Sequence, residues 1–347
     1  MRVLIVRIGA MGDVLHALPA VAALRAKHPG CFIGWAIEPR WSNLLQIAGD
    51  IDDLSQIEGR FDTRALLDRW YSVPTGAWRR RPLASGTRRE IGVLRRVLKD
   101  ERFDVCVDMQ GSMKSAVVGR MAGASVFVGS AQPRERVARL FYGHKVEETA
   151  AHVVEQGCEL LGAAVGETLK PARVTLPMDA EDEHWADATV GHERFCLISP
   201  GAGWGAKMWP AERFGRVAAE LGRAGVPTVV NASVRGSHEA DAVVAGSEGF
   251  ARAVSCSVGQ LIALARRAGV VIAGDTGPLH LAAALERPVV GIYGPTRPAR
   301  NGPHGTRSRV LRDAESVTSH KRIHETEAGM LRIGVDEVVR AALEMLG

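Results

Sequence analysis

The residues with the clearest chemical potential lie near the start of the chain, where an aspartate follows a glycine turn. The apolar run 3–6 predicts a buried strand, residues 7–13 a turn with two glycines, and the spacing of apolar residues up to Leu24 a helix that opens at Asp13. The N–H groups and dipole at a helix start attract ligands, and glycines let a ligand approach the backbone. A carboxylate, Asp13, therefore stands where a ligand is expected to bind.

Asp13 also fits a purely structural role, because aspartate is a good helix cap and many α/β domains begin with a strand, a glycine turn and a capped helix. The spacing Gly9-x-x-Gly12 differs from G-x-G-x-x-G, so a dinucleotide-binding fingerprint is not supported.

The second half repeats this plan in residues 270–284 with clearer signals for a helix start. Pro278 suits the first helical turn, and Asp275 or Thr276 can cap the helix. The N–H groups of such a helix would hold a phosphate. Because a carboxylate repels phosphate, Asp275 is expected to accept hydrogen bonds from sugar hydroxyls beside it. The alternative is a capped helix with nothing bound.

A third turn, residues 200–210, carries a lysine just before a predicted helix. It is not a Walker A loop, because Met208 follows Lys207 where Ser or Thr would hold Mg²⁺. Lys207 can still neutralise a diphosphate as a point charge. Trp204 and Trp209 are expected to be packing residues.

The elements that must position these groups alternate along the chain. Short apolar runs at 103–108, 195–199, 227–231 and 269–273 are separated by helical patterns, which predicts parallel sheets with helices on both faces, and this doubly wound α/β plan occurs twice. Two prolines bracket residues 171–177. We expect one Rossmann-like domain over residues 1–172 and another over 173–330. The closing helix at 331–347 can end either domain, including by packing back on the first.

Open α/β sheets bind ligands beyond the carboxyl ends of their strands. The two domains are therefore expected to face each other across a cleft, with Asp13 on one side and Lys207 and Asp275 on the other.

Bulk composition limits the class of protein. The 347 residues contain 46% hydrophobic residues and carry a formal net charge of +5, an ordinary globular composition. No apolar run is long enough for a spanning helix, and Arg7 and Asp13 interrupt the first apolar stretch, so no signal peptide is expected and the protein should stay in the cytoplasm. The five cysteines show no disulfide or metal-site spacing and are expected to be reduced and mostly buried.

Several motifs together resemble the lipopolysaccharide heptosyltransferases of glycosyltransferase family 9, most closely their heptosyltransferase I branch. The resemblance runs nearly end to end. It is carried by Met1-Arg-Val-Leu-Ile-Val-Arg7, Met11-Gly-Asp-Val-Leu-His16, Asp108-Met-Gln-Gly-Ser-Met-Lys-Ser115, Lys207-Met-Trp-Pro210, Asp275-Thr-Gly-Pro-Leu-His280 and Tyr293-Gly-Pro-Thr296. It implies a GT-B fold, an ADP-activated L-glycero-D-manno-heptose as donor and a Kdo sugar on lipid A as acceptor.

The resemblance also implies residue roles. Asp13 would be the general base of an inverting transfer, Lys207 and Thr276-Gly277 would contact the donor phosphates, and Asp275 would bind the heptose. Pro278 and His280 are included in the donor set, and Gly12 in the acceptor set. No metal or other cofactor is implied. In the loop before Lys207 this chain has Ala202-Gly203 where the family pattern has two threonines, so backbone N–H groups, including that of Gly203, would replace their hydroxyls.

Positive charge concentrates in the first half of the chain. Guanidinium groups match phosphate and carboxylate geometry, and lipid A phosphates and Kdo carboxylates are such anions. Candidate acceptor-binding residues are Arg79, Arg80, Arg81, Lys114 and Arg134. The alternative is nonspecific surface charge, and a solvated helix face accounts for Arg95 and Arg96. A basic patch and an amphiphilic acceptor predict peripheral, salt-sensitive contact with the inner face of an anionic inner membrane.

Other functions stay open at this stage. On the same architecture they are heptosyltransferase II or a sugar-nucleotide epimerase. A sugar-nucleotide sensor without catalysis would bind ADP and lose nothing on Asp13→Ala. A nucleic-acid-binding role is suggested only by the pI near 9.1, and with 5% aromatic residues and no recognition motif no nucleic-acid partner is expected. Asp50-Ile-Asp52 matches a D-x-D metal motif but falls in a polar turn, so no metal ligation is expected there.

Overall fold

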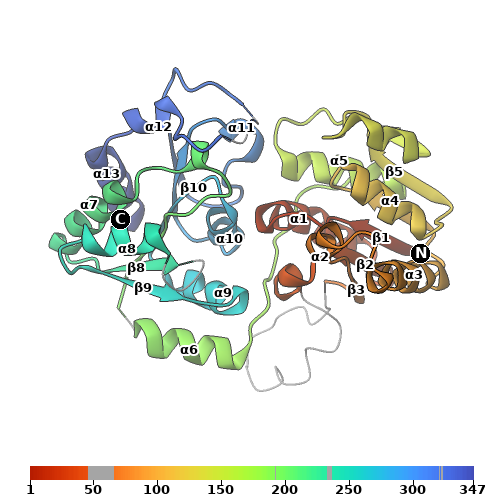
Figure 1. The fold of residues 1–347 in the computed structure, drawn as a ribbon, viewed down its shortest axis with the longest axis horizontal. Coiled ribbons are helices and arrows are strands. Elements are labelled where there is room, and N and C mark those ends of the chain that lie inside the picture. The colour runs from red at the N-terminus through yellow and green to blue at the C-terminus, as the bar shows by residue number, and fades with distance from the viewer. Residues whose placement is uncertain (46–65, 192, 233–236, 320, 322) are drawn as a thin grey trace. The chain divides into compact units, whose positions relative to one another are not determined.

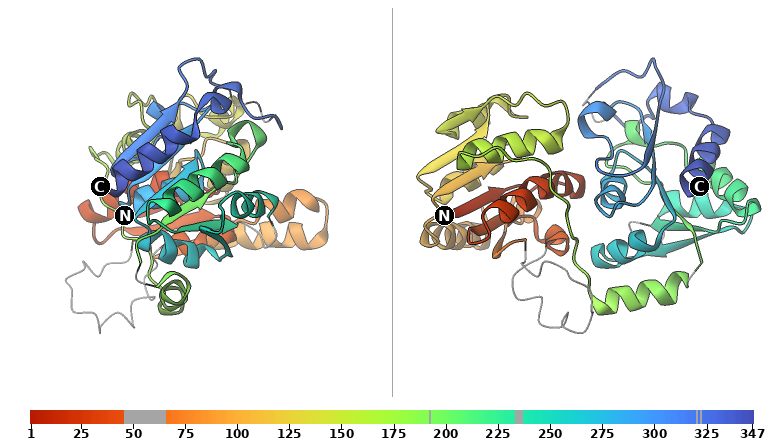
Figure 2. Two further views of the ribbon diagram at one scale, coloured as in Figure 1. Left: turned by 90° about the vertical axis from the view of Figure 1, so that its left-hand side faces the viewer. Right: turned by 180° about the vertical axis from the view of Figure 1, so that it is seen from behind.

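The computed structural model describes residues 1–45, 66–191, 193–232, 237–319, 321 and 323–347. The chain forms two compact units, Met1–Thr175 and Leu176–Gly347, so the boundary lies three residues from the expected position. Each unit is a parallel sheet with helices on both faces (Figures 1 and 2).

The strands and helices of the first unit alternate as the sequence predicts. They are β1 (Arg2–Val6), α1 (Met11–Lys27), β2 (Phe32–Ile37), the 3₁₀ helix η1 (Pro39–Leu44), β3 (Arg69–Ser72), α2 (Thr75–Arg80), α3 (Ser85–Asp100), β4 (Val105–Asp108), α4 (Met113–Met121), β5 (Val126–Ser130), the 3₁₀ helix η3 (Arg136–Phe141), β6 (His144–Val146) and α5 (Val153–Val165).

The second unit repeats the alternation. Its elements are α6 (Ala180–Val190), β7 (Cys196–Ser199), the 3₁₀ helix η4 (Gly205–Lys207), α7 (Ala211–Arg223), β8 (Thr228–Ala232), α8 (His238–Ala245), β9 (Ala251–Ser255), α9 (Val258–Arg267), β10 (Val270–Gly274), α10 (Gly277–Ala284), β11 (Val289–Tyr293), α11 (Pro298–Asn301), β12 (Ser308–Arg312), α12 (Ala328–Arg332) and α13 (Val335–Leu346).

The two sheets have the same strand order. The first runs β3-β2-β1-β4-β5-β6 and the second β12-β11-β10-β7-β8-β9, which is the first order read from the other edge. In each, the chain reverses its direction of winding between two adjacent strands, β1 and β4 in one and β7 and β10 in the other. Ligands of open α/β sheets bind at this switch point, beyond the carboxyl ends of the strands. The fold therefore provides one such place in each unit.

The buried residues show which helices pack against each sheet. In the first unit one face of the sheet is covered by α3, α4 and η3, through residues such as Leu94, Ala116 and Ala138, while α1 and α5 pack against each other. In the second unit α7, α8 and α13 pack into one apolar cluster with the strands. Burying the apolar stripe of each helix is the main favourable contribution to folding.

The C-terminal helix settles one alternative left open by the sequence. Val338, Ala342 and Met345 of α13 are buried in the core of the second unit beside α7. The helix therefore ends the second unit, and the alternative in which it packs back on the first is wrong. Its apolar stripe packs against α7 and the neighbouring strands of the second sheet.

Local signals account for several helix ends. Ser112 and Ser115 form a capping box at the start of α4, and Ser257 and Gln260 do so at α9. All five cysteines are free thiols, and four of them are buried, as expected from their spacing. None of the helices in the described residues combines the length and the apolar character needed to cross a bilayer.

Candidate active site

Asp13 lies in the first turn of α1, beyond the carboxyl end of β1. The helix begins at Met11, two residues earlier than predicted, and its N-cap is Ala10, which makes no side-chain capping bond. Asp13 is therefore not the cap. Its carboxylate Oδ1 is 3.1 Å from Nη2 of Arg7, and about a third of its side chain is exposed. The side chain of Asp13 thus makes an ion pair with Arg7 in place of a capping bond.

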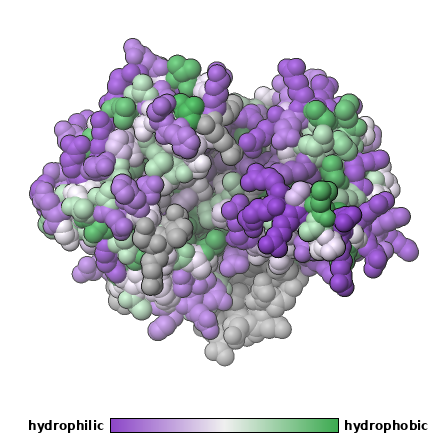
Figure 3. All heavy atoms as spheres, in the orientation of Figure 1, coloured by the Kyte–Doolittle hydropathy of each residue, from purple (hydrophilic) through white to green (hydrophobic). Residues whose placement is uncertain are grey.

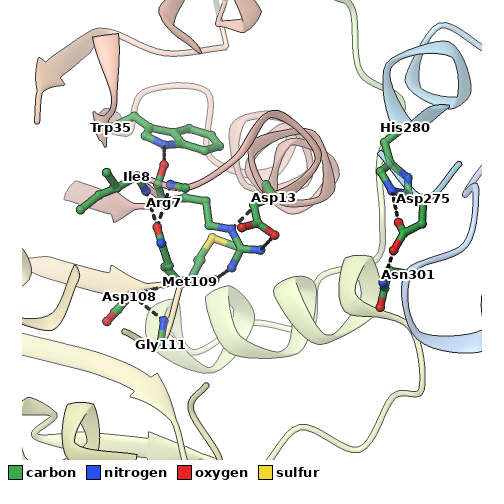
Figure 4. A network of polar contacts seen from close by, with 12 residues as sticks. Arg7, Ile8, Asp13, Trp35, Asp108, Met109, Gly111, Asp275, His280 and Asn301 are labelled. Atoms are coloured by element: carbon green, nitrogen blue, oxygen red, sulfur yellow. Dashed lines mark hydrogen bonds and ion pairs between the residues drawn. The ribbon is translucent and has the colours of Figure 1, made fainter. Parts of the chain in front are cut away.

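Arg7 ties Asp13 to the neighbouring strand (Figure 4). It follows β1 directly, and its Nε donates to the backbone oxygen of Asp13 at 2.9 Å. Its Nη1 donates to the backbone oxygen of Met109, which follows β4. Trp35 in turn donates from Nε1 to the Arg7 carbonyl at 3.1 Å. The guanidinium fork thus holds the first turn of α1 against the two loops at the switch point.

A glutamine and a glycine shape the turn before α1. Gln110 accepts hydrogen bonds at Oε1 from the backbone N–H groups of Ile8, at 2.7 Å, and Gly9, at 2.8 Å. A Cβ atom on Gly9 would lie 2.8 Å from Oδ2 of Asp13 and 3.1 Å from Nε2 of Gln110. Only glycine lets the carboxylate lie this close to the turn.

A buried aspartate anchors the loop that follows β4. Asp108 is 1% exposed, and it accepts from the N–H groups of Gln110 and Gly111, the Ser115 hydroxyl and the Tyr142 hydroxyl. Burial raises its pKa, although these hydrogen bonds act in the opposite direction. The four bonds fix the loop that presents Met109 and Gln110 to α1.

The candidate acceptor-binding residues lie at the starts of α1 and α4, beside the loop after β4, and at the end of α2. Gly12 is in the first turn of α1 beside Asp13, and Lys114 is exposed in the first turn of α4. Arg134 is exposed beside the loop after β4, because a Cβ on Gly111 would lie 3.1 Å from its backbone nitrogen. Arg79, Arg80 and Arg81 are exposed at and just after the end of α2.

In the second unit a lysine and an aspartate pair at the other switch point. Lys207 ends η4 in the loop after β7, and Asp275 directly follows β10. Lys207 Nζ lies 2.5 Å from Oδ2 of Asp275 and donates to its backbone oxygen at 3.3 Å. The Asp275 side chain is 6% exposed and that of Lys207 is 18% exposed. The predicted cation and carboxylate are thus brought together.

Two further side chains complete the Asp275 network (Figure 4). Nε2 of His280, on α10, is 2.9 Å from Oδ1 of Asp275, and Nδ2 of Asn301, at the end of α11, donates to Oδ2 at 3.2 Å. Burial alone would raise the pKa of Asp275. The hydrogen bond with His280 and the charge of Lys207 outweigh it and hold that pKa well below its usual range.

The start of α10 forms a cradle of backbone N–H groups. Thr276 is the N-cap residue, yet its hydroxyl donates to the Gly274 carbonyl at 3.2 Å and makes no capping bond. Asp275 does not cap either, because its carboxylate is turned to Lys207 and His280. Pro278 occupies the first turn as predicted. Within the described residues the N–H groups of Thr276 and Gly277 have no backbone acceptor, which leaves them available to an anion.

The loop before Lys207 has free space at two of its glycines and a tight backbone contact at a third. A Cβ on Gly201 or Gly203 would meet nothing within 4 Å, whereas one on Gly205 would fall on the His324 carbonyl. Trp204 lies under Lys207, with Nζ 5.2 Å from the ring centroid, so it contacts the cation directly. Trp209 is buried against Phe214, as a packing residue should be.

Sequence reasoning assigned no role to Arg7, Gln110 or Asn301. Arg7 and Gln110 each lie within three residues of the end of a predicted strand, a signal that becomes usable once β1 and β4 are known to be neighbours. Asn301 is the last residue of the short helix α11, and no motif surrounds it. Within the described residues no group of three or more His, Cys, Asp or Glu side chains is arranged to hold a metal ion. Asp50 and Asp52 lie outside the described residues.

Comparison with known proteins identifies the family of this chain. Residues 91–330 match the family model of glycosyltransferase family 9 (heptosyltransferase). Lipopolysaccharide heptosyltransferase 1 of Escherichia coli K12 is 30% identical over 90% of this chain and 93% of its own length. The chain belongs to glycosyltransferase family 9.

Solved structures agree with this membership. The E. coli heptosyltransferase WaaC with ADP superposes with a TM-score of 0.79 at 25% identity, covering 99% of this chain and all of that one. WaaC with ADP-2-deoxy-2-fluoro heptose gives 0.75, also at 25% identity. The family resemblance and the doubly wound α/β fold predicted from the sequence are therefore confirmed, with two Rossmann-like units of the GT-B type.

Proposed function

We propose that this protein transfers L-glycero-D-manno-heptose from an ADP-heptose donor to a Kdo sugar of lipid A, with inversion at the anomeric carbon. The observation that carries the proposal is that each unit has complementary reactive groups at its switch point. One presents a carboxylate, Asp13, that no capping bond occupies, and the other presents Lys207 beside the N–H groups at the start of α10. Similarity to heptosyltransferase 1 and to WaaC with its ADP ligands supports the choice of sugar and nucleotide.

The proposed donor site is the second unit. Lys207 and the N–H groups of Thr276 and Gly277 hold the diphosphate, the first as a point charge and the others as fixed dipoles. Asp275, which the Lys207 charge and the His280 bond keep ionised, accepts hydrogen bonds from heptose hydroxyls. In this arrangement the cation lies between the carboxylate and the phosphates.

In the proposed step Asp13 is the general base. It takes the proton of the acceptor hydroxyl as that oxygen forms a bond to the anomeric carbon from the side opposite the leaving group. The bond from that carbon to the phosphate oxygen breaks, and ADP leaves with the electron pair. Lys207 and the α10 N–H groups offset the charge that develops on the diphosphate, a role that other enzymes give to a metal ion. We propose that no metal is required.

On the acceptor side, Gly12 allows close approach beside Asp13. Lys114 and the arginines at 79–81 and 134 are exposed cations suited to the carboxylates of Kdo and the phosphates of lipid A. Because the acceptor is amphiphilic, we place the protein at the inner face of the inner membrane as a peripheral protein.

A transfer assay with purified protein tests the proposal. ADP-heptose and Kdo-lipid A should yield ADP and an acceptor heavier by one heptose, with the same rate after treatment with EDTA. Turnover only on an already heptosylated acceptor would assign heptosyltransferase II instead. ADP binding without transfer to either acceptor would identify a sugar-nucleotide sensor, and a rate abolished by EDTA would refute metal independence.

A further inference from the structure

One side of the first unit combines exposed apolar side chains with exposed positive charge. We call it the docking face, and define it by six side chains on the outer surfaces of α3, α4 and η3 and on the segment just before α3. They are Leu83, Val93, Met113, Val117, Val137 and Leu140. The inner residues of the same helices cover the sheet, so these six point away from the core. Apolar side chains lie among hydrophilic ones over this unit in Figure 3.

The exposure of these residues is unusual for aliphatic side chains. Leu83 and Leu140 are each 83% exposed, and Val137 is 48% exposed. A single exposed leucine is ordinary on a globular protein, but apolar groups gathered on one side mark an interaction surface.

The charge of the chain is concentrated in the same segment. Residues 75–141 contain fourteen Lys and Arg against six Asp and Glu, a net charge of +8, whereas the other 280 residues together carry −3. Around the apolar residues lie exposed basic side chains on all three helices. They include Arg88, Arg89, Arg95, Arg96, Arg120, Arg136 and Arg139.

We propose that the docking face binds an anionic lipid bilayer, with Val137 and Leu140 entering the interface and the surrounding arginines contacting lipid phosphates. Exposed aliphatic residues and arginines on the same helices match the two layers of such a surface, in which acyl chains lie below anionic headgroups. A nucleic acid would call for exposed aromatic rings, and the six large apolar residues of the face are all aliphatic or Met.

The docking face adjoins the loop after β4, which is linked to Asp13 through Arg7. The N–H of Met113, at the start of α4, donates to Oε2 of Glu135 at 2.9 Å, and the Glu135 N–H donates to the carbonyl of Gly111 in the loop after β4. That loop presents Met109, whose carbonyl accepts from Arg7, the partner of Asp13. A bilayer on the docking face would therefore lie near the carboxyl ends of β1 and β4, where the acceptor sugar is proposed to react. The inference deepens the proposed function, on which its choice of a membrane rests.

Vesicle co-sedimentation tests the proposal with the full chain. The protein should sediment with vesicles of phosphatidylethanolamine that contain about one quarter phosphatidylglycerol. With vesicles of phosphatidylcholine, the amount of sedimented protein should be at least about tenfold lower. Val137→Asp/Leu140→Asp should lower retention on the anionic vesicles by at least about tenfold. Arg136→Gln/Arg139→Gln should lower it at low salt and make little difference at high salt.

Matched controls separate this surface from general effects. Leu331→Asp/Leu343→Asp changes two exposed leucines of the second unit, and should bind vesicles like the unchanged protein. Val137→Asp/Leu140→Asp should keep its ADP affinity and its transfer to a de-acylated, water-soluble Kdo acceptor, which also shows that it folds.

Three results would overturn the proposal. They are equal retention of unchanged protein on both vesicle types, full retention of Val137→Asp/Leu140→Asp on anionic vesicles, and a dimer of the unchanged protein that this double variant abolishes, which would assign the face to self-association. If vesicle binding behaves as expected but no heptose is transferred to any acceptor, the proposed function fails and the docking face stands.

Discussion

Lys207 and Asp275 are 68 residues apart in the chain, and their side chains meet at 2.5 Å. They meet because β7 and β10 are adjacent parallel strands, with Ser199 beside Ala273, so the loops that follow them leave the sheet together. Without a donor, the lysine is held by the carboxylate. In the proposed donor complex, the same cation would be shared between the carboxylate and a diphosphate, so the ion pair would keep the lysine in place for its ligand.

Replacing Lys207 by Met should weaken ADP binding by about 10- to 100-fold, because the diphosphate loses its charged partner. Isothermal titration with ADP measures this. Arg216→Met, which removes an exposed cation from α7, is the control and should leave ADP affinity unchanged. Equal ADP affinity in Lys207→Met and the unchanged protein would remove this lysine from the donor site.

Replacing Asp13 by Ala or Asn should lower kcat by about 10²- to 10⁴-fold, since the general base is lost. ADP affinity should stay within a few-fold, because the carboxylate acts on the acceptor. Rapid-quench measurement of heptose transfer, together with ADP titration, separates the two effects. Asp100→Asn, at the end of α3, is the control. Turnover that persists in Asp13→Ala would refute the role of this residue.

Gly9→Ala should reduce heptose transfer about as much as losing the general base, at nearly unchanged stability. The added Cβ would lie 2.8 Å from Oδ2 of Asp13, so the carboxylate must move while the sheet stays intact. Gly30→Ala is the matched control, because its Cβ would meet nothing within 4 Å. Equal rates in the two variants would show that the position of the carboxylate does not limit the reaction.

Asp275 should make stability depend on pH in the acid range. Its pKa is lower in the folded protein than its ordinary value of 3.8, so its contribution is present above about pH 4 and is lost as pH falls through the folded value. Asp275→Asn should cost about 2–3 kcal/mol at neutral pH, because Lys207 loses its partner. Urea unfolding should show a constant difference between pH 7 and pH 5 that shrinks below about pH 4. A difference that grows towards acid pH would contradict this assignment.

Asn301 should act as a positioning residue through Asp275. Asn301→Ala removes the bond to Oδ2 and should raise the KM for ADP-heptose by about 3- to 10-fold with kcat little changed, while the affinity for ADP, which lacks the sugar, stays the same. The control Arg300→Ala changes its exposed neighbour. An equal loss of affinity for ADP and ADP-heptose would indicate a general disturbance of α11.

Local patterns in the sequence were sufficient for the alternation of strands and helices, and they placed Lys207 on the same side as Asp275. Pro278 and the glycine before Asp275 marked the start of α10 within a residue, because proline and glycine act through their own backbone geometry. Asp275 does not cap α10, because its carboxylate bonds Lys207 and His280 instead. These partners depend on tertiary structure and could not be predicted from local sequence.

The partners of Asp13 could not be predicted in the same way. Arg7 reaches Met109 and Gln110 reaches Ile8 across about a hundred residues of chain, and which loops meet depends on the order of strands in the sheet. That order follows from how the whole unit packs. Asp108 is a similar case, since its four bonds come from a loop, a helix and Tyr142.

The glycine at 205 has a consequence for protein engineering. The segment around it donates from Ala206 to the Ile323 carbonyl and accepts from Glu327, and any side chain at 205 would strike His324. The turn that carries Lys207 and the strip at 323–327 therefore form one exchangeable module. A chimaera that imports a relative's turn alone should fold poorly, whereas one that imports both pieces should recover the recipient's thermal stability.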